Sequence, residues 1–146
     1  MAHAERTVTI GRPIGEVFDF LADGTNNPKW RHAVLDVTLA AGEGATAVYA
    51  QGVRGPGGRR LAGDYRVDGF ERPHRLTVEV TAGPVRPTIG FELHELAPAS
   101  TSVRCTVDLR PRGLLGRLTD GAVGRGMEEE VAHLEDLKAY LEEASS

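Results

Sequence analysis

The last third of the sequence, from Leu114 to Ala144, is the feature that most constrains how the chain can fold. Its second half carries apolar residues at three- and four-residue steps, namely Met127, Val131, Leu134, Leu137 and Leu141. On a helix of 3.6 residues per turn this spacing places them in one continuous stripe, with acidic residues on the opposite side. A long, one-sided helix of this kind predicts a broad apolar surface for it to lie against, which the preceding chain must supply.

The first half of that segment is rich in glycine, which weakens a helix by roughly 1 kcal/mol per residue relative to alanine. The glycines stand among leucine and valine residues, at Gly113, Gly116, Gly121, Gly124 and Gly126. One interpretation is a broken connection before a helix that begins near Arg125. The other is that small residues leave room for a ligand under the helix, or let the helix hinge as a gate. Both interpretations can hold together.

Before this segment the sequence predicts mostly strands, with two short helices near the start. Residues 6–10 alternate polar and apolar, residues 14–21 carry apolar residues at helical spacing, and residues 26–30 suit a second short helix. From residue 34 to residue 109 the apolar period is two, interrupted by turn residues, which indicates an antiparallel meander. This order predicts an α+β fold in which a curved antiparallel sheet of about seven strands wraps around the long C-terminal helix.

Composition narrows the classes of function. The 146 residues suit one domain spanning positions 1–146, which is large enough for a hydrophobic core. No apolar run approaches the roughly 20 residues of a membrane span, and a net charge of -4 gives no basic footprint for nucleic acid. The single cysteine, Cys105, excludes an internal disulfide. Together with the lack of a signal-peptide pattern at the N-terminus, it favours a cytoplasmic location.

Several segments carry a family resemblance. They are residues 11–23 (GRPIGEVFDFLAD) followed by 27–30 (NPKW), Gly44, residues 99–102 (ASTS) and residues 134–142 (LEDLKAYLE). Together they resemble the START-like (SRPBCC) superfamily, the helix-grip fold of polyketide cyclase/dehydrase-related proteins and the birch-pollen allergen. The resemblance covers nearly the whole chain, and it implies an apolar cavity, between the sheet and the C-terminal helix, that receives a small hydrophobic molecule. Members include carriers, hormone receptors, cyclases and many uncharacterised bacterial proteins, so the resemblance specifies fold better than function.

Strand alternation indicates which side chains face that cavity. The inward positions are mainly aliphatic, and they run from Val8 and Ile10 through Leu35 and Val37 to Leu109. Together with the short helices and the C-terminal helix, these strands predict a ligand-binding cavity lined by Trp30, Tyr49, Gln51, Tyr65, Val78, Phe91, Leu93, Cys105, Val123, Met127 and Val131.

The aromatic members of this set have two interpretations each. Tyr49 and Tyr65 either donate hydrogen bonds to a ligand carbonyl or are core residues whose hydroxyls are satisfied by the protein. Trp30 either caps the mouth of the cavity or pins the short helices to the sheet.

The inner face offers little for catalysis or metal binding. The ionisable residues of the strands, including Asp64, Glu79, Glu92 and His94, fall on the outward side. A one-residue bulge would be needed to bring Asp64 or His94 inward. Cys105 has no histidine placed to activate it and is expected to be a small buried hydrophobe. The sequence therefore assigns no catalytic residue, no metal ligands and no cofactor.

Binding of a small hydrophobic ligand, lipid- or polyketide-like, is the function that the sequence favours. One alternative is an enzyme of cyclase, aromatase or dehydratase type that works by cavity shape and tyrosine hydrogen bonds. A second is a protein-interaction module that displays the acidic helix face, where residues 127–144 hold seven acids and one lysine. A homodimer through the apolar stripe is possible in principle, although the sheet already requires that stripe.

Overall fold

A computed structural model of the chain describes residues 2–83, 85–109 and 125–143. The first half contains β1 (Ala2–Ile10), α1 (Ile14–Ala22), η1 (Gly24–Lys29), β2 (Val34–Ala41), η2 (Gly44–Thr46), β3 (Val48–Arg54) and η3 (Pro56–Gly58). The second half contains β4 (Arg60–Ala62), β5 (Tyr65–Glu71), β6 (Arg75–Val80), β7 (Thr88–Ala97), β8 (Ser100–Leu109), a helical segment at residues 125–132, and α3 (Leu134–Glu143).

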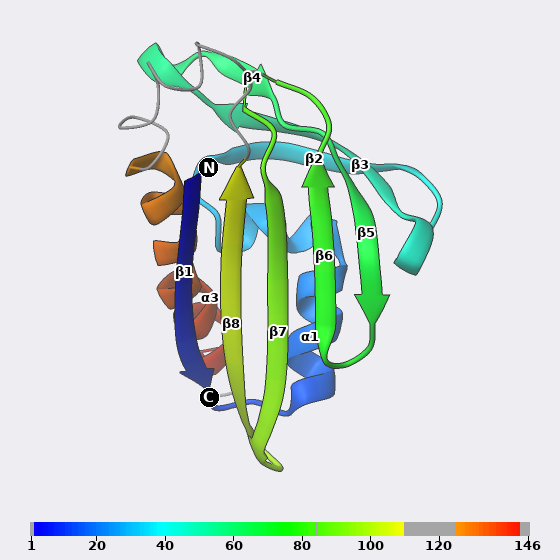
Figure 1. Ribbon diagram of the computed structural model, residues 1–146, viewed down its shortest axis with the longest axis vertical. Helices are drawn as coiled ribbons and strands as arrows, with labels where there is room; N and C mark the ends of the chain where they lie inside the picture. The colour runs from blue at the N-terminus through cyan, green and yellow to red at the C-terminus, as the bar shows by residue number, and fades with distance from the viewer. Residues whose placement is uncertain (1, 84, 110–124, 144–146) are drawn as a thin grey trace.

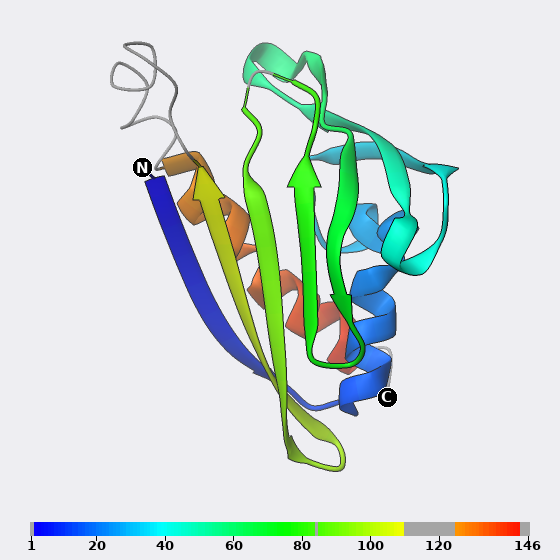
Figure 2. The ribbon, with the colours of Figure 1, turned by 45° about the vertical axis from the view of Figure 1, so that its right-hand side comes forward.

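The strands form one antiparallel sheet in the order β1-β8-β7-β6-β5-β3-β2, with β4 paired to β3. β1 pairs with β8, so the first and last of the described strands are neighbours along their length. Figure 1 shows α1 and α3 on one face of this sheet, while β2 and β3 run across one end of the longer strands. The turned view in Figure 2 shows that the sheet curves around these helices. The predicted α+β architecture, with the sheet gripping the C-terminal helix, is therefore confirmed.

The predicted helix near the N-terminus is present as α1, whose buried residues are Val17, Phe18 and Leu21. Phe18 is fully buried, and its ring meets that of Phe70 edge-on at a centroid distance of 5.2 Å. After α1 the side chain of Asp23 accepts a hydrogen bond from the Thr25 amide, which caps η1. These contacts fix the chain between α1 and β2 against the inner face of the sheet.

The apolar stripe of the C-terminal helix is confirmed as its buried face. Its five members, Met127, Val131, Leu134, Leu137 and Leu141, are each at most 5% exposed. The helix is not continuous, however, because His133 adopts a turn conformation between the two helical stretches. The expectation for the glycine-rich half falls mainly on residues 110–124, which lie outside the described residues.

One strand position differs from its expected orientation. Alternation places Leu35 on the inner face, but the structure leaves it 41% exposed, whereas Val34 is buried. The reason is a register shift in the β2–β3 ladder between Val34 and Asp36, where an additional residue on β2 reverses the alternation. Of the helices described, none is both long enough and apolar enough to cross a membrane.

Candidate functional site

The residues predicted to line a cavity gather between the sheet and the C-terminal helix. Within the described part of the chain these predicted residues are all buried: Trp30, Tyr49, Gln51, Tyr65, Val78, Phe91, Leu93, Cys105, Met127 and Val131. Val123 lies outside the described residues. They belong to the main core apart from Gln51, which is a buried polar residue. The prediction that they line a ligand cavity stays a prediction, and the polar groups among them indicate what such a cavity can recognise.

A short hydrogen-bonded chain crosses this interior from η1 to the sheet. The Nδ2 group of Asn27 donates to Oε1 of Gln51 at 2.9 Å and to Oη of Tyr65 at 2.8 Å. Gln51 in turn donates through Nε2 to the carbonyl oxygen of Gly63 at 3.3 Å. Because Tyr65 accepts from Asn27, its own hydroxyl hydrogen is left to donate, and no acceptor for it lies among the described residues.

The two interior tyrosines have different roles in this arrangement. Their rings stack at a centroid distance of 5.0 Å. Tyr49 donates its hydroxyl hydrogen to the carbonyl oxygen of Ala22 at 3.3 Å, as the core interpretation expected. Burial raises the pKa of Tyr65 to about 12, although the hydrogen bond from Asn27 and the charge of Arg31 act in the opposite direction. Tyr65 is therefore a neutral hydrogen-bond donor near pH 7.

Trp30 and Arg31 place two further donors in the same region. Trp30 is 2% exposed and packs edge-on against Phe91, so it anchors the end of η1 to the middle of the sheet. The guanidinium of Arg31 lies over the Trp30 ring, with Cζ 5.1 Å from the ring centroid, and is buried as well. Neither Nε1 of Trp30 nor Nε of Arg31 has a hydrogen-bond partner among the described residues.

Arg31 is held from the other side by the C-terminal helix. Its Nη2 forms an ion pair with the carboxylate of Glu130, whose side chain is 29% exposed. Burial lowers the pKa of the Arg31 guanidinium, partly offset by Cys105 and Tyr65 nearby. An arginine stays protonated in proteins, so this is a buried cation neutralised by one carboxylate. The loop after η1 and the helix at residues 125–132 are thus joined across the interior.

Cys105 is expected to be unreactive in the folded protein. Burial raises its pKa to about 12, so at pH 8 roughly one molecule in 10,000 carries the thiolate, against about one in four for an ordinary thiol. Because the chain has one cysteine, labelling with dithiobis(nitrobenzoate) reports this residue alone. We expect no labelling of native protein over the time in which guanidinium-unfolded protein reacts completely. Rapid, stoichiometric labelling of native protein would mean that Cys105 faces open, solvent-filled space.

The acidic face of the C-terminal helix is largely engaged with the rest of the domain. Glu135 pairs with Arg6, Glu130 pairs with Arg31, and Glu142 accepts from the Gly11 amide. Asp136 lies beside two histidines, with Nδ1 of His133 at 3.1 Å and Nε2 of His32 at 3.7 Å. These contacts leave less of the face available to a protein partner than the sequence suggested.

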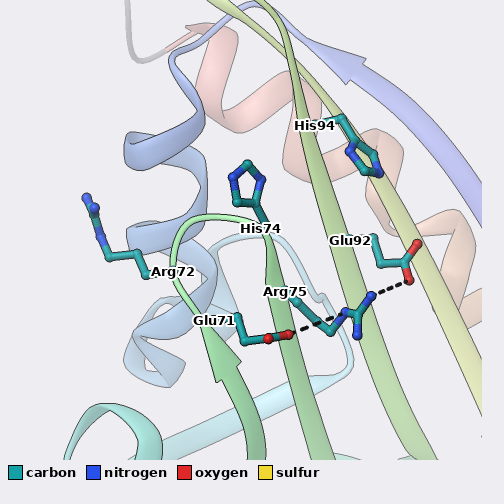
Figure 3. Close-up of a pocket in the computed structure, with 6 residues that line it drawn as sticks. All are labelled: Glu71, Arg72, His74, Arg75, Glu92 and His94. Carbon is teal, nitrogen blue, oxygen red and sulfur yellow. Dashed lines mark ion pairs between the residues drawn. The ribbon is translucent and has the colours of Figure 1, made fainter.

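A hollow of about 300 Å³ lies on the outer side of the sheet, where the β5–β6 turn meets β7. Its lining is charged and consists of Glu71, Arg72, His74, Arg75, Glu92 and His94 (Figure 3). Arg75 sits between the carboxylates of Glu71 and Glu92, at 3.7 Å and 3.6 Å, and all three side chains are exposed. Exposed pairs of this kind contribute little binding energy. His94 faces outward here, as predicted.

Three residues of the interior were not identified from the sequence as functional candidates. Asn27 was interpreted only as part of a short helix and of the family resemblance, and Arg31 and Glu130 were not singled out. Periodicity gives no signal for Arg31, because it follows η1 in an irregular connection. Glu130 stands three residues after Met127 and four before Leu134, so helical spacing places it beside the apolar stripe, and its side chain reaches Arg31. For Arg31 the remaining signal is chemical, because a charged residue next to a core tryptophan needs a partner of opposite charge.

Comparison with known families decides the relationship. The model of a family described as "Polyketide cyclase / dehydrase and lipid transport" matches residues 1–142. The chain belongs to this family. A search of curated proteins gives no match.

Solved structures support the family's fold. The chain superposes on a protein of Thermus thermophilus with a TM-score of 0.79 and 18% identity, over 99% of both chains. An aromatase/cyclase of Streptomyces sp. R1128 gives 0.76 and 19% identity, over 98% of this chain and 93% of that one. A START superfamily protein of Mycobacterium smegmatis gives 0.73 and 15% identity, over 99% and 97%. At these identities the likeness establishes the fold, so the predicted helix-grip fold is confirmed, and the family model confirms the predicted relationship to polyketide cyclase/dehydrase proteins.

Proposed function

We propose that this family member binds a small hydrophobic molecule, lipid- or polyketide-like, between the sheet and the C-terminal helix. The observation that supports this most directly is a set of three buried donors that have no acceptor among the described residues: Nε1 of Trp30, Nε of Arg31 and the hydroxyl of Tyr65. Buried donors without acceptors are costly, at about 1–3 kcal/mol each, unless something supplies the acceptors. An apolar ligand that carries oxygen atoms would supply them.

Native mass spectrometry of the purified protein, followed by solvent extraction, tests this proposal. We expect a co-purifying apolar compound, or uptake of one from a panel of lipids and aromatic polyketides. A clean apo mass that the panel leaves unchanged would contradict the proposal.

A cyclase-type enzyme is the second candidate, and Tyr65 is the observation that favours it. Its hydroxyl accepts from Asn27 and keeps its own hydrogen for an acceptor, which is the arrangement that polarises a ligand carbonyl. An aromatase/cyclase is also among the structures with this fold. In this function Tyr65 would stabilise negative charge that develops on a carbonyl oxygen as a ring closes.

Tyr65→Phe separates the carrier from the enzyme. For a carrier, we expect ligand affinity to fall by less than about tenfold, since one neutral hydrogen bond is lost. For an enzyme, turnover of a polyketide substrate should fall by about a hundredfold or more while binding persists, because an oxyanion donor acts mainly in the transition state. Tyr49→Phe is the matched control, because the Tyr49 hydroxyl already donates to Ala22. Equal turnover in the Tyr65→Phe and wild-type proteins would remove Tyr65 from any reaction.

A further inference from the structure

The charge around Arg31 restricts which ligand the interior can take. The guanidinium and the Glu130 carboxylate form an ion pair, so their charges cancel. Nε of Arg31 and the nearby Nε1 of Trp30 both have no hydrogen-bond partner among the described residues. The site therefore offers hydrogen-bond donors but no uncompensated positive charge.

From this we propose that the interior selects neutral, acceptor-bearing apolar ligands, such as ketones or esters, and that Glu130 excludes carboxylates by already occupying Arg31. The inference rests on the proposed hydrophobic-ligand function and specifies its ligand class. A neutral carbonyl oxygen satisfies Trp30 Nε1 or Arg31 Nε without changing the charge of the interior. A carboxylate would bring a second negative charge beside Glu130, in a region where charges are weakly screened.

Among the described residues, the electrostatic neighbours of Arg31 supply no second positive charge for an anionic ligand. Tyr65 and Cys105, the groups that act electrostatically on Arg31, carry no positive charge. The other basic group on the adjoining loop is His32, which is 68% exposed and lies 3.7 Å from Asp136. An anion entering this part of the interior would therefore have to displace Glu130 from Arg31. Glu130 thus determines ligand specificity, because its carboxylate already neutralises the charge of Arg31.

Three naphthalene probes of similar size test the inference by equilibrium dialysis, each read by its own absorbance. Methyl 2-naphthoate is a neutral acceptor, 2-naphthoate is its anion, and 2-ethylnaphthalene has no acceptor. We expect wild-type protein to bind the ester about tenfold or more tightly than the anion, and more tightly than the hydrocarbon. Because this comparison uses wild-type protein, its result does not depend on whether the variants fold.

Glu130→Gln should remove the exclusion. It frees the charge of Arg31, so affinity for 2-naphthoate should rise by about tenfold or more while affinity for the ester changes by less than about threefold. Glu129→Gln is the matched control, because it removes the same charge from an exposed position one residue away on the same helix. It should leave the affinities for all three probes unchanged. Circular dichroism establishes that each variant is folded before its affinities are compared.

The outcomes separate the two proposals. If wild type binds 2-naphthoate as tightly as the ester, or if folded Glu130→Gln binds it no better than wild type does, the charge exclusion is overturned while hydrophobic binding stands. If 2-ethylnaphthalene binds as tightly as the ester, the unpaired donors do not recognise the ligand, which overturns the selection of acceptors. If none of the probes binds wild type, the proposed hydrophobic-ligand function fails, and the inference fails with it.

Discussion

Leu134→Ala is expected to lower the free energy of unfolding by about 2–5 kcal/mol. Leu134 is the first residue of α3, and its side chain is 0% exposed within the core between helix and sheet. Truncation removes three carbon atoms of buried surface and leaves a cavity that the surrounding strands can close only in part. Because a typical domain is stable by about 5–15 kcal/mol, this is a large fraction of the total. Urea denaturation followed by circular dichroism measures the loss.

Glu128→Ala is the control for this substitution. Glu128 is exposed in the helical segment at residues 125–132, which precedes α3, so its replacement by a good helix former should change stability by less than about 0.5 kcal/mol. Similar, small effects of the two substitutions would show that the sheet does not hold the helix in solution. If the slope of the unfolding free energy against urea concentration is unchanged, the Leu134 substitution alters stability and not the compactness of the unfolded chain.

The fold was predictable because its buried surfaces follow simple periods. The stripe from Met127 to Leu141 is buried as predicted, since a 3.6-residue period fixes one face of a helix whatever lies opposite. Val8 and Ile10 are buried in the same way, because alternation fixes the two faces of β1. Long, regular elements of this kind allow sequence patterns to define a fold before any contact is known.

Where the backbone is irregular, the patterns failed. The bulge that exposes Leu35 depends on the pairing of β2 with β3, and no feature of β2 alone specifies it. The apolar spacing continues across His133, yet the helix is interrupted there by a turn. The spacing constrains which side chains face the sheet and carries no information about backbone hydrogen bonds.

The candidate site was predictable only in its apolar part. Alternation placed Gln51 and Tyr65 inside, and both are buried. It could not supply their partner Asn27, because the short helix that carries Asn27 is brought to the sheet by tertiary packing. The Arg31–Glu130 pair joins a loop to a helix about a hundred residues later in the chain, and sequence periodicity carries no information about such distant pairs. The groups that would recognise a ligand are thus those that depend most on the folded structure.

Gly24→Ala should also destabilise the protein strongly, by about 2–4 kcal/mol. Gly24 is buried at the start of η1. A Cβ atom there would lie 2.1 Å from the Tyr65 hydroxyl and 2.9 Å from atoms of the Tyr49 ring. Neither ring can easily withdraw, since the two stack on each other and their hydroxyls are bonded to Asn27 and Ala22. Relief of the overlap would therefore break at least one of these contacts. Thermal and urea unfolding measure the loss.

Gly126→Ala is the matched control for the same chemical change. Gly126 is in the helical segment at residues 125–132, and a Cβ atom there meets nothing within 4 Å. The substitution should leave stability unchanged or raise it by up to about 1 kcal/mol, because alanine is the better helix former. A loss at Gly24 with no loss at Gly126 assigns the effect to the crowded interior.

A double-mutant cycle identifies the atom responsible. The Tyr65 hydroxyl is the atom nearest to the added methyl group, so Tyr65→Phe in the Gly24→Ala background should recover about 1 kcal/mol or more. In the wild-type background the same Tyr65→Phe change should cost about 0.5–1.5 kcal/mol, because Asn27 loses an acceptor. A change of sign between backgrounds is the signature of a steric overlap. If Tyr65→Phe lowers stability equally in both backgrounds, the steric explanation is contradicted. Gly24 would then be required for a reason other than the space that it leaves for the Tyr65 hydroxyl.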